Sequence, residues 1–152
     1  LAENIFTGDL VVLDANGQLL PHTAEELNNI GVFAGVSYTA SDGEYIYSKF
    51  WPSGTVATDI VAYVYDDPYI VYRVQSAGTP AQTNVGNCAD VVAGTGSTTT
   101  GQSGFNLNGT MSNGTATCKI IGLWEDPSNS FAQYAQLEVL INEHILKQTA
   151  GI

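Results

Sequence analysis

Positive charge is the scarcest property of this sequence, which has 4 Lys and Arg against 15 Asp and Glu and a formal net charge of −11 over 152 residues. A surface with so few cations cannot displace the counterions of a nucleic-acid backbone, and an anionic membrane repels it. We therefore expect neither a nucleic acid nor a membrane as a partner.

Long apolar runs are missing too. No stretch approaches the roughly 18 residues that a membrane-spanning helix needs. Residues 1–4 lack the basic region and apolar stretch of a secretory signal, so we expect no signal peptide in the chain as given. Hydrophobic residues nevertheless make up 44% of the chain and aromatic residues 10%, which is enough to build a folded core.

Cysteine is limited to Cys88 and Cys118. Two cysteines are too few for a disulfide scaffold or a four-cysteine zinc site. Pairing them would close a loop of about 30 residues and stabilise the fold by roughly 3–4 kcal/mol. The alternative, two free buried thiols, is the interpretation we favour.

Turn residues punctuate the chain at regular intervals, as at Asn16-Gly17, Asp42-Gly43 and Asp66-Asp67-Pro68. Between them lie short segments rich in β-branched and aromatic residues, and no segment has the pattern of a long helix. Residues 23–27 have room for one or two helical turns at most. The expected strands are residues 10–13, 18–20, 30–38, 44–51, 60–65, 69–75, 117–123 and 135–141. This spacing predicts a mainly β fold, a β-sandwich or barrel-like domain with long irregular loops and an extended N-terminal arm.

The expected organisation is an N-terminal arm over residues 1–7 and a single β domain over residues 8–152. Within that domain, residues 75–117 form a neutral region rich in Gly, Ser and Thr, in which Asp90 is the one charged residue. Apolar residues are scattered through this region, so we expect an ordered loop with irregular strands that lies against a partner.

The residue types that carry catalysis are present without a catalytic arrangement. Asp66-Asp67 and Glu125-Asp126 are paired acids, but each pair precedes a proline after a strand, where acids commonly form turns. His22 and His144 are the histidines, and no Gly-x-Ser-x-Gly turn supplies a nucleophile. We therefore expect no catalytic residue, no metal site and no cofactor, and a protein that is not an enzyme.

Aromatic residues gather in the first half of the chain, where two interpretations compete. They could form a platform on which sugars stack, or they could be half-buried residues of a sheet, which is the more common role at this spacing. These residues are Tyr45, Tyr47, Phe50, Trp51, Tyr63, Tyr65, Tyr69 and Tyr72.

The N-terminal arm carries large apolar side chains before the first expected strand. We expect it to lie along a neighbouring subunit or shell, although Ile5 and Phe6 could instead fold back onto their own domain. Phe50 and Trp51, at the end of a strand, are expected to anchor the sheet packing or a subunit contact, and His144 to satisfy backbone groups or lie at an interface. The candidate interface residues are Leu1, Ile5, Phe6, Phe50, Trp51 and His144.

Several segments resemble structural proteins of tailed bacteriophages. Residues 8–13, 16–19, 31–36 and 50–55, which read GDLVVL, NGQL, GVFAGV and FWPSGT, are similar in order to head decoration (cement) proteins of the lambda-like type. Further segments resemble virion proteins of marine and cyanobacterial phages, namely AYVYDDP at 62–68, VYRVQ at 71–75 and INEH at 141–144.

The resemblance implies a virion structural protein that is made in the host cytoplasm and binds the outside of the mature capsid. There it would stabilise the capsomer lattice, with the major capsid protein as partner and a homotrimer as the favoured oligomer. The alternative is a fibre or spike domain that binds a carbohydrate or a host receptor.

Overall fold

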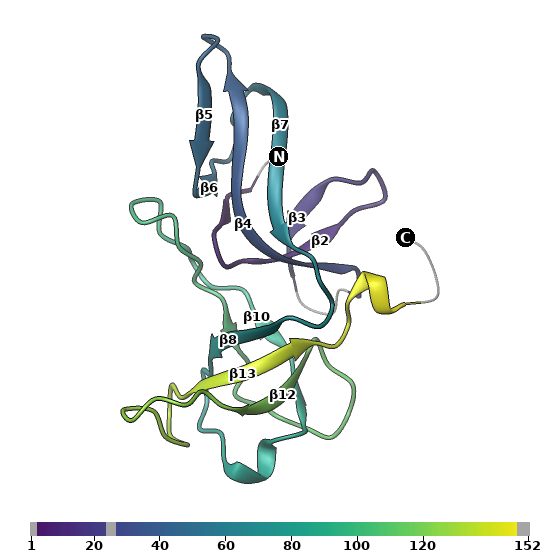
Figure 1. Cartoon of the computed structure of the whole chain (residues 1–152), viewed down its shortest axis with the longest axis vertical. Helices are drawn as coiled ribbons and strands as arrows, with labels where there is room; N and C mark the ends of the chain where they lie inside the picture. The colour runs from purple at the N-terminus through teal and green to yellow at the C-terminus, as the bar shows by residue number, and fades with distance from the viewer. Residues whose placement is uncertain (1–2, 24–26, 149–152) are drawn as a thin grey trace.

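The computed structural model describes residues 3–23 and 27–148, and these form mainly β structure with several antiparallel sheets and no closed barrel (Figure 1). The mainly β, sandwich-like fold predicted from the turn spacing is confirmed. Residues 24–26, where helical turns were expected, lie outside the described residues. No helix in the described part is long and apolar enough to cross a membrane.

The first sheet is built around one long central strand, β4 (Asn29–Ala40). Its first half pairs with β2 (Leu10–Leu13), which in turn pairs with β3 (Leu19–Pro21), and its second half pairs with β5 (Tyr45–Ser48). Strand β7 (Ala57–Tyr65) pairs with β4 between Val32 and Ala40, and these residues overlap the ones that pair with β2 and β5. Because a strand has two edges, β7 lies along the opposite edge of β4.

The second sheet has the order β8 (Val71–Gln75), β13 (Gln136–Ile141), β12 (Cys118–Leu123) and β9 (Cys88–Ala89). Figure 1 shows it below the first sheet. Two further pairs are β1 (Ile5–Phe6) with β6 (Phe50–Trp51), and β10 (Val91–Val92) with β11 (Asn106–Leu107). Short 3-10 helices occupy η1 (Gln82–Asn84) and η2 (Ile145–Lys147).

Local sequence chemistry accounts for many of these elements. The Asn16-Gly17 hairpin forms as expected, and the Asp14 carboxylate stabilises it by accepting hydrogen bonds from the backbone N–H groups of Asn16 at 2.9 Å and Gln18 at 2.7 Å. In β13 the alternate residues Leu137, Val139 and Ile141 are all buried, as the period of two predicts.

Each sheet has its own hydrophobic cluster, and β2 joins them. Val11 belongs to the cluster under the first sheet, whereas its neighbour Leu10 belongs to the cluster of the second sheet. Successive residues of a strand point to opposite faces, so this one strand contributes to both clusters.

The N-terminal segment does not extend toward a neighbour as expected. Ile5 and Phe6 form β1, pair with Trp51 and Phe50, and are buried within their own chain. The ring of Phe6 stacks on Phe50 with centroids 5.4 Å apart. The expectation of a clamp reaching another subunit is therefore wrong for Ile5 and Phe6. The alternative, folding back, is what the structure has, because two large apolar side chains find a hydrophobic site in their own domain.

The neutral region packs against this N-terminal strand. The backbone N–H of Thr7 donates to the carbonyl of Gly101 at 3.0 Å, and the N–H of Ser103 donates to the carbonyl of Thr7 at 2.9 Å. Gly96 lies against the ring of Phe6, where a Cβ would come within 2.2 Å of a ring carbon. The glycines of this region thus permit close packing on the first sheet.

Candidate interaction surface

Four tyrosines project from one face of the first sheet. Tyr45 and Tyr47 alternate along β5, and Tyr63 and Tyr65 alternate along β7, so each pair points to one side of its strand. Tyr47 and Tyr63 meet across β4 with ring centroids 5.7 Å apart, which places both pairs on the same face. Their exposed fractions are 66%, 65%, 41% and 58% in chain order. We call this set, together with exposed Val61, the tyrosine face.

Small residues of the central strand create the space for these rings. Gly35 pairs with Tyr63, and Ser37 pairs with both Tyr47 and Val61. A Cβ at Gly35 would lie 3.2 Å from the Tyr47 hydroxyl, and the hydroxyls of Ser37 and Tyr63 are hydrogen bonded at 3.1 Å. The rings of Tyr47 and Tyr63 therefore lie over β4, and Ser37 is buried beneath them. Their positions are set before any partner arrives.

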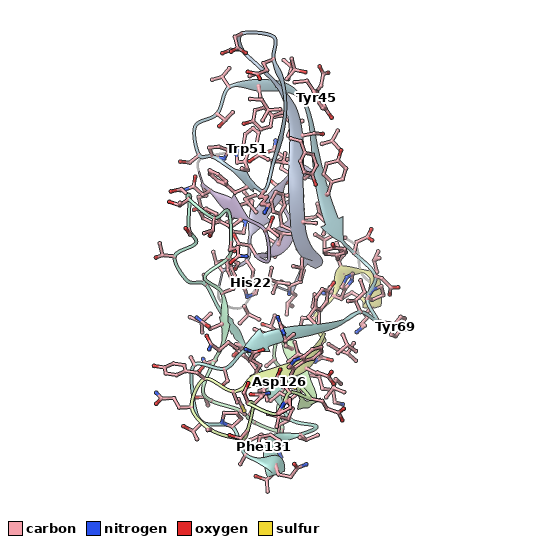
Figure 2. The ribbon with its side chains drawn as sticks, turned by 60° about the vertical axis from the view of Figure 1, so that its left-hand side comes forward. His22, Tyr45, Trp51, Tyr69, Asp126 and Phe131 are labelled. Carbon is pink, nitrogen blue, oxygen red and sulfur yellow. The ribbon has the colours of Figure 1, made fainter. Side chains whose placement is uncertain are left out.

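The tyrosine face is nearly free of charge. Strand β5 carries no charged residue, and Asp59 is the one charged residue of β7. Protein interfaces are enriched in tyrosine and depleted of lysine and glutamate in this way. An exposed aromatic group of this size on a rigid sheet is typical of a binding surface. Figure 2 shows Tyr45 near the top of the first sheet, well away from Tyr69.

A cleft of about 600 Å³ lies between the two sheets. Its lining includes Arg73, whose guanidinium lies 5.1 Å from the centre of the Trp124 ring. Burial, together with the nearby acids Asp67 and Asp66, raises the pKa of Tyr72 to about 12, and its hydroxyl donates to the carbonyl of Tyr65 at 2.8 Å. Arg73 is exposed and alternates along β8 with Tyr72 and Val74, which pack against the cluster of the second sheet, so its guanidinium lies with Trp124 on the opposite face of that sheet.

Both cysteines are free, as favoured from the sequence, but Cys118 is buried whereas Cys88 is half-buried. Cys118 pairs with Ala89 across the sheet, whereas Cys88 pairs with Lys119. The two thiols thus project from opposite faces of the sheet, which prevents a disulfide. Burial raises the pKa of Cys118 to about 12, so this thiol stays protonated at neutral pH and is a poor nucleophile.

The histidines are buried in structural positions. Nδ1 of His22 lies 2.8 Å from Oδ1 of Asn29, and the Asn29 side-chain amide donates to the carbonyl of Glu143 at 2.9 Å, which connects the first sheet to the end of β13. Nδ1 of His144 accepts from the N–H of Leu146 at 3.1 Å, and burial lowers the pKa of His144. The described residues include no group of three or more His, Cys, Asp or Glu that could hold a metal ion.

Asp9 is a buried carboxyl that closes the turn after β1. Its Oδ2 accepts from the N–H of Phe6 at 2.7 Å, and its own N–H donates to the carbonyl of Phe6 at 2.9 Å. Burial raises the pKa of Asp9, and the hydrogen bonds from Ser103 and Phe6 offset part of this rise. The role of Asp9 follows from the turn between β1 and β2, which its two hydrogen bonds with Phe6 close.

The residues expected at an interface fall into separate places. Four of them come together where β1 meets β6, since Ile5 pairs with Trp51 and Phe6 pairs with Phe50. Phe50 is half-buried, and the other three are buried. Trp51, labelled in Figure 2, is buried in the sheet packing, which is one of the two places expected for it. Its ring meets that of Tyr38 edge-on, with ring centroids 5.3 Å apart. His144 lies at the start of η2, and Leu1 lies outside the described residues.

The tyrosine face was only partly anticipated. Half-burial was the favoured interpretation of the aromatic residues, yet five of them are exposed, namely Tyr45, Tyr47, Tyr63, Tyr65 and Tyr69. The sequence signal for exposed rings on this face is the pair of small residues in the neighbouring strand, at positions 35 and 37.

No protein-family model matches this chain, and no curated protein and no solved structure matches it.

Proposed function

We propose that this protein is a capsid decoration protein, which binds the outside of a mature phage shell and stabilises its lattice. The observation that carries the proposal is the tyrosine face, an ordered, nearly uncharged aromatic surface on a rigid sheet. The resemblance of several segments to head decoration proteins supports the same role. The major capsid protein would be the partner, with copies of this chain arranged as trimers on the shell.

The tyrosine face can supply the binding free energy that this role needs. The exposed parts of its four rings amount to on the order of 400 Å² of mostly apolar surface. Burying that area would contribute roughly 10 kcal/mol before the costs of association are subtracted. Those costs are reduced here because Tyr47 and Tyr63 are already held over β4.

Stabilisation would follow by linkage. A protein that binds the mature lattice and not its precursor favours the mature lattice by its binding free energy at every occupied site. The effect is repeated over all copies, so a modest affinity per copy is sufficient.

A fibre or spike domain that binds a carbohydrate is the second candidate, and the exposure of the tyrosine rings favours it. The planes of Tyr47 and Tyr63 are inclined at 47°, however, so the two rings do not form one flat platform for a sugar. Decoration therefore remains the function that the geometry supports best.

Counting copies in purified virions of the phage that encodes the chain tests the proposal. Quantitative mass spectrometry against the major capsid protein should give a decoration stoichiometry, with copy number scaling with the number of capsomers. A copy number typical of a tail fibre, combined with binding on a glycan array, would establish the second candidate instead.

A further inference from the structure

Strand β7 leaves one of its two edges open. Of the described strands, only β4 pairs with it, along the edge that faces the sheet interior. Figure 1 shows β7 at the margin of the first sheet. The backbone groups along its other edge are therefore available to a further strand.

This edge has few of the features by which proteins protect exposed strands. β7 is nine residues long, and residues 60–65 read IVAYVY, with no charge, proline or glycine. Ile60, Val61, Tyr63 and Tyr65 are all exposed. Native edges are normally short, charged or covered. An apolar edge of this length is typical of a site that another strand covers.

Charge at the two ends of the edge indicates what kind of strand fits. Asp59 precedes the apolar run, and Asp66 and Asp67 follow it. No Lys or Arg occurs between Lys49 and Arg73. A complementary strand would carry apolar residues over about 20 Å, the length of six extended residues, with basic residues at both ends.

We propose that the open edge of β7 binds an extended apolar segment of a partner protein, flanked by Lys or Arg, by adding it as a strand to the first sheet. This inference rests on the proposed function for the identity of the partner, which would be the capsid shell protein. The chemistry of the segment follows from β7 itself. Backbone hydrogen bonds would give affinity, and the acids at each end would select the basic flanks.

A second copy of this chain fits the edge less well. Residues opposite each other in an antiparallel pair must direct their N–H groups the same way, so a two-fold axis passes between equivalent residues. Pairing of two β7 strands about an axis at Tyr63 would place Asp59 of each copy opposite Asp67 of the other. Because no cation lies between residues 49 and 73, these like charges have no neighbour in the strand to offset them.

The test uses a synthetic peptide with alternating valine and threonine over six residues and two lysines at each end. Fluorescence anisotropy with the full chain should show saturable binding. The same peptide with every amide of the six-residue run N-methylated should not bind, because neither of its edges can then donate hydrogen bonds to the ladder. A version with glutamates at both ends should bind at least tenfold more weakly.

Protein variants locate the binding to β7. Val61→Pro and Ala62→Pro are made as a pair, because consecutive residues of an antiparallel strand direct their N–H groups to opposite edges. Proline at the residue whose N–H points to β4 breaks the sheet, whereas proline at the residue whose N–H points to the open edge leaves the circular dichroism spectrum of the parent unchanged. This second variant should lose peptide binding. Asp59→Asn with Asp66→Asn should weaken binding of the lysine peptide roughly tenfold and reduce its salt dependence.

Equal binding of the N-methylated peptide, equal binding of the glutamate peptide, or no binding of the lysine peptide would overturn the inference. A proline variant that lowers the oligomeric state in the absence of peptide would assign the edge to a second copy and overturn it too. Peptide binding is measured without capsids, so a failure to bind peptide would overturn the strand-addition inference and not the decoration role. A protein that binds the peptide but does not decorate capsids would overturn the decoration role and not strand addition.

Discussion

Replacing Ile5 with alanine should lower the free energy of unfolding by about 3–4 kcal/mol. Ile5 is 1% exposed and packs in the cluster that includes Val11, Phe33 and Trp51. The substitution removes three carbon atoms, worth about 2.4 kcal/mol at 0.8 kcal/mol each, and the unfilled cavity adds roughly 1–2 kcal/mol. This is a large share of the 5–15 kcal/mol that typically stabilises a domain.

Urea unfolding followed by tryptophan fluorescence measures this loss, and the melting temperature should fall by roughly 6–16 °C. Val56→Ala is the matched control, because Val56 is 78% exposed and its truncation should change stability by less than about 0.5 kcal/mol. A loss below about 1 kcal/mol for Ile5→Ala would refute the placement of β1 in the core. Such a result would revive the N-terminal arm as a contact with another chain.

Three further changes test other parts of the structure. Gly31→Ala should lower the free energy of unfolding by at least about 2 kcal/mol, because the added Cβ would lie 2.0 Å from the carbonyl oxygen of Tyr65. Urea unfolding measures this loss, and a value below about 1 kcal/mol would contradict the contact between β4 and β7. Burial raises the pKa of Asp9 above its unfolded value, so the stability it contributes is present at low pH and lost as pH rises through the folded pKa. The free energy of unfolding of Asp9→Asn, relative to that of the parent, should therefore be higher at pH 7 than at pH 4. The opposite trend in urea unfolding would refute the raised pKa of Asp9. In native protein a thiol reagent should modify Cys88 well before Cys118, as read by peptide mass spectrometry, and equal rates would contradict the burial of Cys118.

Local signals in the sequence were sufficient for most strands and turns. The Asn16-Gly17 hairpin depends on two adjacent residues and on Asp14, which all lie within one turn. The buried face of β13 follows from alternation within the strand itself. These features need no information from distant parts of the chain.

Long-range pairing accounts for what the sequence did not reveal. Ile5 finds its partner at Trp51, and nothing near either residue specifies that pairing. The tyrosine face is a similar case. Alternation in β5 predicts two faces, but which face is open depends on Gly35 and Ser37 in the adjacent strand. Residues expected at an interface were consequently found in the core.

Capsid binding by a variant of the tyrosine face measures whether the protein decorates capsids through that surface. Tyr45→Thr, Tyr47→Thr and Tyr65→Thr are combined in one chain, since threonine suits an exposed strand and leaves the buried face unchanged. Tyr69→Thr is the control, because Tyr69 is 76% exposed and lies outside the tyrosine face. With expanded capsids stripped of the protein, the control should bind normally and the folded triple variant should bind at least tenfold more weakly. Full decoration of capsids by the triple variant would show that the tyrosine face is not the capsid-binding surface.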